Sequence, residues 1–455
     1  MYLCACFMTY FFQSYASHYK ALGRLGLPIV VGQIGQIVLG FADTMMIGHH
    51  STVELGAAAF VNTMFNLILI AALGFSYGMT PVVGSFYGQK DTVRIGETVK
   101  NGLLANTLLA IVLLVLMYVF YLNLGNLGQP EELLPLMRPY FIVQLVSLTF
   151  VLWFNCLKQF FDGITQTVTP MWVMLSGNII NIVGNWLLIY GVAGLPELGL
   201  LGAGIATLLA RVYMAVMLAA VFLWNRRFAA YRQAFVEGKV NRSDFVKLNK
   251  LGFPLALQMG METASFSLTS MMVGWIGTTA LAAHQIMLTV SQVCFMMYYG
   301  MAAAVAVRIS FFCGMKNYPS LLRTSYAGFH LVLFLAVCGA IPIFLLRHVI
   351  GYWFTSDVEV ATLVAATVIP FVIYQFGDGM QCNYANALRG LSYVKPMMYI
   401  AFLAYFVVSL PLSYVFGIVM GGGLAGIWWA FPFGLTTAGV LYYWVFMMRF
   451  NKLNR

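Results

Sequence analysis

Long apolar runs alternate with short polar segments along almost the whole chain. Twelve runs approach the ~20 residues that a helix needs to cross the hydrocarbon core of a membrane. They are apolar on every side, whereas barrel strands alternate apolar and polar residues. We therefore predict an all-α integral membrane protein of twelve transmembrane helices. The expected spans are 28–47, 55–80, 102–122, 140–157, 171–190, 200–224, 254–276, 281–307, 326–346, 361–388, 397–420 and 424–448.

An internal repeat divides these spans into two sets of six. The motif LGRLGLP ends at Pro28 and LNKLGFP ends at Pro254, and TMMIG (44–48) matches SMMVG (270–274) at the same spacing. Six spans repeated in one orientation predict two lobes related by a pseudo-twofold axis along the membrane normal, with a cleft between them. The expected segments are an N-terminal tail (1–19), an N-lobe (20–230), a cytoplasmic linker (231–250) and a C-lobe (251–455).

Composition and charge support this assignment. Hydrophobic residues make up 61% of the chain and charged residues 8%, which excludes a water-soluble fold. With twelve spans, all but three of the 24 Lys and Arg residues fall on the side that holds both termini, the exceptions being Arg138, Arg211 and Arg347. Basic residues are retained on the cytoplasmic side, so we expect both termini there, and the net charge of +10 reflects topology rather than nucleic-acid binding. The seven scattered cysteines indicate neither a disulfide framework nor a zinc site.

Three acidic residues interrupt otherwise apolar spans: Asp43, Glu262 and Asp378. A carboxylate near the bilayer centre costs roughly 2.5–3.5 kcal/mol, so such groups usually face a cavity, an ion or a basic partner. Arg211 can neutralise at most one of them. Glu262 and Asp378 lie at similar estimated depths, and Tyr374 precedes Asp378 by one helical turn. We expect these three residues to form a cation site, with Glu262 and Asp378 as candidate sodium ligands; a purely structural Tyr374 fits equally well.

A second polar group is expected in the N-lobe. Asn181 and Asn185 share one face of their helix, and Asn185 lies at the same estimated height as Asp43. Amide oxygens with one carboxylate suit a hard monovalent cation or a proton, and Thr207 adds a hydroxyl. Hydrogen bonding between helices is the alternative role for the two asparagines. Gln36 shares a face of the first span with Asp43, and we expect that face to line the cleft.

The chain resembles the multidrug and toxic compound extrusion (MATE) transporters, and within them the NorM-type branch. The likeness covers 20–450 and is carried by the motifs GFADTMMIGHHS with Asp43, METASF with Glu262, AAHQI from Ala282, YQFGDGMQ with Asp378, ANALRG, and NIVGN with Asn181 and Asn185. It implies a bacterial inner-membrane protein that alternates between inward-open and outward-open states. It also implies that Glu262, Asp378 and Tyr374 bind the coupling cation in one lobe.

The resemblance further implies that Asp43, Asn181, Asn185 and Thr207 form the cation site of the N-lobe, and that Gln285 lies in the cleft near substrate. Archaeal-type relatives carry an acid where this chain has Asn185, which weakens the case for a proton-only switch and favours sodium. We expect a secondary active antiporter that exports small cationic amphipathic molecules in exchange for Na⁺ or H⁺, without a cofactor and as a monomer in the lipid bilayer.

Two other classes of function fit the sequence less well. A lipid-linked oligosaccharide flippase shares the architecture, but its pyrophosphate substrate calls for Arg and Lys in the cleft, and Arg211 stands nearly alone. An enzyme embedded in the membrane requires a catalytic constellation that the sequence does not contain. We therefore expect no enzymatic activity.

Overall fold

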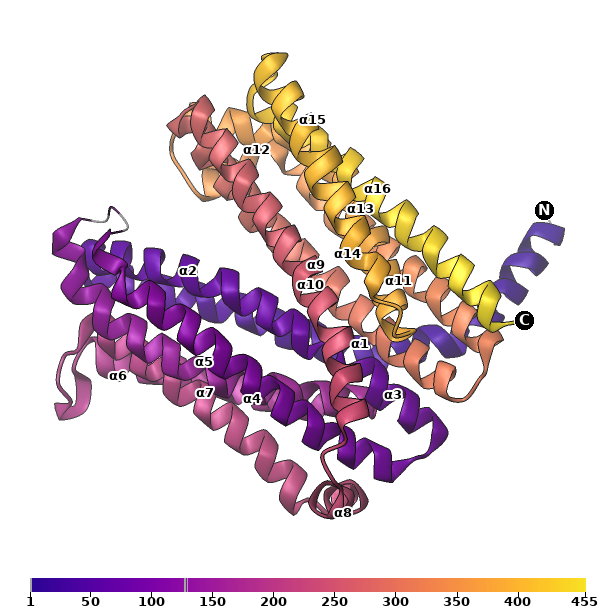
Figure 1. Cartoon of the computed structure of the whole chain (residues 1–455). Coiled ribbons are helices and arrows are strands. Elements are labelled where there is room, and N and C mark those ends of the chain that lie inside the picture. The colour runs from indigo at the N-terminus through magenta and orange to yellow at the C-terminus, as the bar shows by residue number, and fades with distance from the viewer. Residues whose placement is uncertain (1, 127, 129) are drawn as a thin grey trace. The chain divides into compact units, whose positions relative to one another are not determined.

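The computed structural model describes residues 2–126, 128 and 130–455, and over these residues the regular structure is helical (Figure 1). The N-terminal half contains the following helices: α1 (Tyr2–His50), α2 (Thr52–Ser76), α3 (Met79–Gln89), α4 (Thr92–Leu122), α5 (Leu134–Gly163), α6 (Val168–Ile189), α7 (Gly199–Trp224) and α8 (Ala229–Glu237). The C-terminal half contains α9 (Arg242–Ile276), α10 (Thr278–Gly314), α11 (Tyr318–Leu345), α12 (Arg347–Ile350), α13 (Val358–Gly390), α14 (Lys395–Ala401), α15 (Leu410–Tyr414) and α16 (Gly423–Leu453). The π-helical segment Phe402–Ser409 joins α14 to α15, and a second one, Val415–Val419, follows α15, so the four segments form one continuous helix.

The repeat is visible in the helix bounds. At the spacing that separates Pro28 from Pro254, α4 corresponds to α11, α5 to α13 and α7 to α16. The pair α2 and α3 corresponds to the single helix α10, because the N-terminal copy is interrupted at Tyr77 and Gly78. Each half thus contains the six predicted membrane helices, and the all-helical fold is confirmed.

Helix caps also repeat. Asp91 accepts a hydrogen bond from the backbone N–H of Arg94 (3.0 Å) at the start of α4, and Asn317 accepts one from Ser320 (3.2 Å) at the start of α11. Before these caps, Lys90 and Lys316 adopt the left-handed conformation (φ 59° and 57°) that ends the preceding helices. Equivalent positions therefore end and restart the chain in both halves.

Within the described residues, eleven helices are long and apolar enough to cross a membrane. The predicted seventh span falls in α9, which is outside the eleven because polar residues, among them Gln258, Glu262 and Thr269, lower its hydropathy. Large apolar side chains are exposed along the helices, as on α4 at Val112 (63%) and Val115 (61%). Surfaces this apolar are stable only against lipid or another protein, so the chain is a multi-pass membrane protein.

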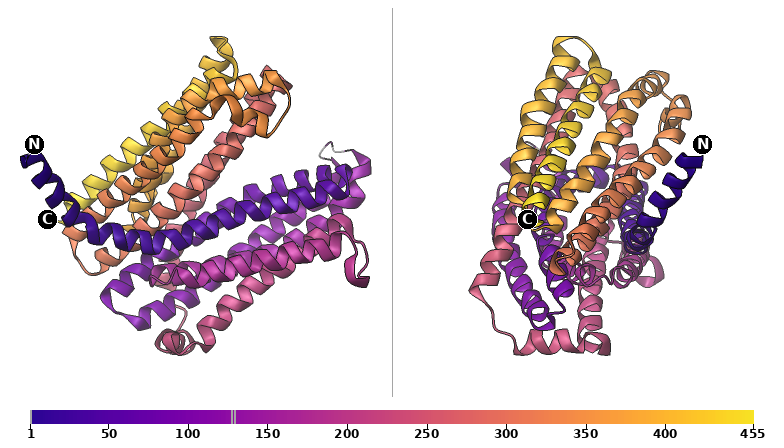
Figure 2. Two further views of the ribbon diagram at one scale, coloured as in Figure 1. Left: turned by 180° about the vertical axis from the view of Figure 1, so that it is seen from behind. Right: turned by 90° about the vertical axis from the view of Figure 1, so that its right-hand side faces the viewer.

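By contacts between residues, the chain forms two compact units. The N-terminal unit is Val31–Ala256, and the C-terminal unit combines Met1–Val30 with Leu257–Arg455. These bounds differ from the predicted lobes because α1 and α9 are continuous helices that each begin in one unit and end in the other (Figures 1 and 2). Residues 2–19, predicted to be a tail, belong to α1, since no Gly or Pro precedes Gly23.

Each unit packs around one central helix. In the N-terminal unit α5 contacts α2, α4 and α7, and α7 contacts α6. In the C-terminal unit α13 contacts α10, α11 and α16. These two helices have among the largest buried shares of their span, 56% each. From Thr367 onward the polar residues of α13 are buried, and so they are held in protein rather than lipid.

Candidate cation-binding sites

Glu262 and Asp378 lie close enough in the C-terminal unit to repel each other when both are ionised. Glu262 projects from α9 and accepts hydrogen bonds from the side-chain amides of Gln258 and Gln381, both at 3.3 Å. Gln381 also donates to the hydroxyl of Tyr405 (2.5 Å), which lies in the first π-helical turn. Three helical segments therefore hold Glu262 in place.

Two oxygen atoms of this group have no hydrogen-bond donor. They are Oδ2 of Asp378 and Oε1 of Gln381, both buried. Asp378 and Gln381 are three residues apart on α13, so their side chains share a face of the helix. Buried acceptors without a donor are costly, and a cation or an added proton relieves that cost. With Glu262, the group offers oxygen ligands of the kind that a hard cation prefers.

Tyr374 lies one turn before Asp378 and is 3% exposed. Its hydroxyl is hydrogen-bonded to the hydroxyl of Ser291 on α10 at 2.5 Å, and its ring packs against Phe371, Trp428 and Phe431. Tyr374 interacts electrostatically with Asp378 but is not hydrogen-bonded to it. The structure thus places Tyr374 next to Asp378, without a hydrogen bond to the carboxyl group of either Asp378 or Glu262.

The N-terminal unit brings together all four residues that the sequence analysis grouped. The amide of Asn185 donates to Asp43 Oδ1 (2.5 Å) and to Asn181 Oδ1 (3.1 Å), and Asn181 donates to Thr207 Oγ1 (3.0 Å). Turning the Asn181 amide over places its nitrogen 2.7 Å from Asp43 Oδ1 and its oxygen 3.0 Å from Thr207 Oγ1. The second orientation gives Asp43 two N–H donors, which stabilise an ionised carboxylate.

Arg211 belongs to the same unit, four residues after Thr207 on α7 and hence on the same helix face. It donates to Gln144 Oε1 (2.9 Å) and Ser147 Oγ (2.5 Å) of α5 and lies over the ring of Phe65 (5.1 Å to its centroid). It interacts electrostatically with Asp43 but forms no ion pair with it. Arg211 is therefore a fixed positive charge near the N-terminal group.

No ion pair involves Asp43, Glu262 or Asp378 among the residues that the structure describes. The same residues contain no cluster of three or more His, Cys, Asp or Glu side chains that could hold a metal ion. The ligands available at each site are one or two carboxylates with amide and hydroxyl oxygens. This chemistry fits a monovalent cation or a proton better than a transition metal.

Two predicted cleft residues lie outside these groups. Gln36 and Gln285 are both exposed, and in the described part of the chain no side-chain hydrogen bond joins either of them to Asp43, Glu262 or Asp378. Sequence reasoning missed Gln258, Gln381 and Tyr405. Helical spacing could have identified the first two, since Gln258 is four residues from Glu262 and Gln381 is three from Asp378. Nothing in the sequence indicated Tyr405.

Comparison with known proteins agrees with the repeat. The MatE family model matches residues 28–187 and 254–415, one segment in each half. "Probable multidrug resistance protein NorM" of Xylella fastidiosa (strain 9a5c) is 29% identical over 448 residues, covering 98% of this chain and 95% of the relative. "Multidrug resistance protein NorM" of Aliivibrio fischeri is 28% identical over 433 residues, covering 94% of each.

Solved structures show the same fold. "Crystal structure of MATE in the bent conformation" has a TM-score of 0.88 and 18% identity and covers 96% of both chains. "Outward-facing conformation of a multidrug resistance MATE family transporter of the MOP superfamily" has a TM-score of 0.87 and 19% identity, with 96% of this chain and 97% of the other covered. Because the family model spans most of both repeats and the fold agrees over nearly the full length, this chain belongs to the MatE family.

Proposed function

We propose that the protein is a secondary active multidrug efflux antiporter that exports organic cations in exchange for Na⁺ or H⁺ by alternating access. Its proposed location is the bacterial inner membrane, with both termini in the cytoplasm. The relatives named multidrug resistance protein NorM support this class of function. Transport, rather than catalysis, is the activity proposed.

One observation carries the proposal. Each half of the repeat holds a half-buried carboxyl group to which a side-chain amide donates, Asp43 in one half and Glu262 in the other, and Glu262 lies beside the buried Asp378. Among the residues that the structure describes, no basic residue forms an ion pair with any of the three. An uncompensated acid in a membrane helix is expensive, so it is retained where it binds something positive. The C-terminal group has two orphaned oxygens, one of them a carboxylate oxygen of Asp378, whereas the N-terminal group has one, the amide oxygen of Asn185, so the C-terminal group is the stronger of the two proposed sites.

The residues suggest a division of labour. Glu262 and Asp378 bind the entering cation, and Gln258 and Gln381 orient Glu262. Binding of that cation removes the negative charge that attracts an organic cation, so drug and coupling ion compete for the same carboxylates. Each charge that enters down a potential of 100 mV supplies ~2.3 kcal/mol. Asp43, held by Asn185, is a second cation site with its own partner groups.

The cationic class of substrate follows from the charge of both groups. An oligosaccharide flippase is disfavoured, because pyrophosphate requires clustered Arg and Lys. Arg211, the basic residue of the N-terminal unit that lies near a site, is already hydrogen-bonded to Gln144 and Ser147.

Purified protein in proteoliposomes tests the function. We expect a sodium or proton gradient, imposed separately, to drive ethidium transport, and we expect Glu262→Gln and Asp378→Asn each to reduce the rate at least tenfold. Asp43→Asn should weaken coupling, because it removes the carboxylate that pairs with Asn185. The exposed Glu132→Gln, which also removes one negative charge, is the matched control.

The outcomes are distinct. Unchanged ethidium transport in all three variants would refute the site assignment. Transport that neither gradient drives, in wild-type protein that binds ethidium, would refute antiport.

A further inference from the structure

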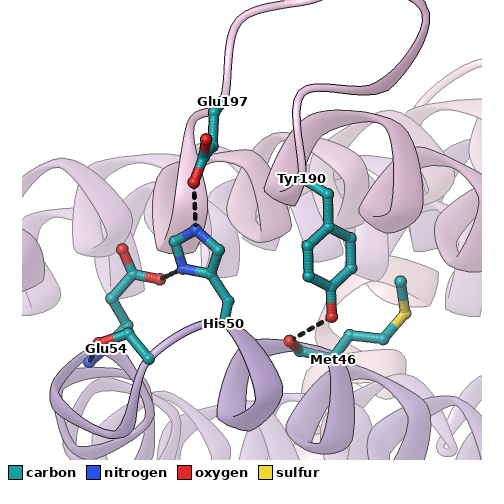
Figure 3. A network of polar contacts seen from close by, with 6 residues as sticks. Met46, His50, Glu54, Tyr190 and Glu197 are labelled. Atoms are coloured by element: carbon teal, nitrogen blue, oxygen red, sulfur yellow. Dashed lines mark hydrogen bonds and ion pairs between the residues drawn. The ribbon is translucent and has the colours of Figure 1, made fainter.

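A histidine lies between two carboxylates where α1 ends. His50 is the last residue of α1, Glu54 lies in the first turn of α2, and Glu197 lies in the segment that joins α6 to α7. All three belong to the N-terminal unit, at the end of α1 remote from the chain's N-terminus. Figure 3 shows the ring of His50 with one carboxylate on each side. This group is separate from the residues around Asp43.

Both ring nitrogens are engaged. Nδ1 of His50 is 2.8 Å from Glu54 Oε2, and Nε2 is 2.9 Å from Glu197 Oε1. A neutral imidazole carries a hydrogen on one nitrogen only, and a carboxylate accepts but does not donate. Both contacts are favourable only if the ring is a doubly protonated imidazolium or if one carboxyl group is itself protonated. In either case the cluster holds one proton more than a neutral histidine with two carboxylates.

The surrounding backbone is shaped for this arrangement. Ser51 caps α2 and accepts from the backbone N–H of Glu54, which fixes the start of that helix. Gly199 has a positive φ of 51°, and a side chain there would collide with the carboxyl group of Glu54. Gly191, at φ 65°, leaves room for the backbone of Glu197 in the same way. Two glycines thus let both acids approach the ring.

The other titratable groups near His50 do not satisfy its nitrogens. Tyr190, at the end of α6, lies edge-on to the ring (6.1 Å between centroids) but donates its hydroxyl to the backbone oxygen of Met46. His49 is exposed, and its Nδ1 contacts the backbone oxygen of Met45. The two carboxylates lie on opposite sides of the ring and do not converge on one point, so the group is not a metal site.

We propose that His50, Glu54 and Glu197 form a proton-binding clasp that ties the α6–α7 segment to the junction of α1 and α2. With its extra proton the clasp is closed, as in Figure 3. When the proton is lost, one ring nitrogen of His50 has no hydrogen to donate, and its lone pair faces a negatively charged carboxylate, which it repels. The more exposed partner, Glu197 (66%), then separates, and the segment is released. Stabilisation by the clasp is present at low pH and is lost as pH rises through its titration midpoint.

The test is the titration of His50 in full-length protein in lipid nanodiscs, followed by NMR of ¹³C-labelled histidine. The chain has six histidines, so His50→Gln assigns the resonance and His49→Gln is the matched control. We expect His50 to remain protonated above the ~6.5 midpoint of a free imidazole. We expect Glu197→Gln and Glu54→Gln each to lower the midpoint by about half to one pH unit, because each removes a negative charge beside the ring.

Hydrogen exchange of residues 190–198, corrected for intrinsic pH dependence, reports the release itself. Protection should fall with rising pH in the wild type and should not depend on pH in His50→Gln. A midpoint at or below ~6.5 that neither glutamine variant moves, or identical exchange profiles in wild type and His50→Gln, overturns the proposal. These measurements do not depend on transport, so they stand apart from the proposed antiport.

Discussion

Asp43 and Arg211 carry opposite charges in the same unit, yet each is hydrogen-bonded to neutral partners. Asp43 binds Asn185, and Arg211 binds Gln144 and Ser147. A direct ion pair would neutralise the acid permanently, whereas a nearby positive charge only weakens its attraction for a second cation. We therefore expect Arg211 to lower the affinity of the proposed Asp43 site for a cation.

Removing this charge should tighten cation binding at Asp43. We expect Arg211→Met to strengthen the apparent affinity for Na⁺, or the proton affinity, several-fold, since ~1.4 kcal/mol of lost repulsion corresponds to tenfold. Arg211→Lys keeps the charge and should remain close to wild type. The measurement is cation-dependent release of bound ethidium from purified protein. Equal effects of both substitutions would show that the shape of Arg211, and not its charge, is what matters.

At the scale of helices, α1 and α9, which each begin in one unit and end in the other, carry a glycine at the same position of the repeat. Gly252 of α9 faces the ring of Phe75, and a Cβ there would lie 2.5 Å from it. Gly26 of α1 faces Met301, with a Cβ 2.8 Å from the sulfur. Each pair lies within one compact unit, and small residues of this kind allow close packing of membrane helices.

The two glycines should differ in their tolerance of a methyl group. A buried phenylalanine ring is stiff, whereas methionine has three rotatable bonds and can move aside. Gly252→Ala should therefore lower thermal stability by about 1–3 kcal/mol through overpacking, and Gly26→Ala by less. Gly23→Ala, on α1 with no atom within 4 Å of the new Cβ, is the control and should be neutral or stabilising. A thermal melt in detergent that shows equal losses at both glycines would contradict this argument.

For the whole molecule, the distribution of charge predicts the orientation in the membrane. Seven of the basic residues, from Arg226 to Lys250, lie in the longest polar stretch between the two halves. Positively charged segments stay in the cytoplasm, so this stretch and both termini should face it.

Reporter fusions test that orientation. Green fluorescent protein fused after Arg455 should fluoresce, because it folds in the cytoplasm. Alkaline phosphatase fused after Pro130, between α4 and α5, should be active, because that segment should face the other side. Fusions after Lys239 should behave like those at the C-terminus. The reverse pattern would place the clasp at His50 on the cytoplasmic side and invert the proposed topology.

The sequence alone determined the class of fold, the repeat and the residues around Asp43. Membrane helices are local, apolar on all sides and close to one length, and acids stand out against that background. Asp43 and Asn185 lie on different helices but at the same estimated depth in the membrane, and this was sufficient to group them. Only the tertiary structure identified Tyr405 as a partner of Gln381, and Ser291, rather than Asp378, as the partner of Tyr374. These contacts depend on how each helix is rotated against its neighbours, which apolar runs do not encode. The clasp at His50 has the same origin, since its third member, Glu197, is distant in sequence and reaches the ring only through a turn between helices.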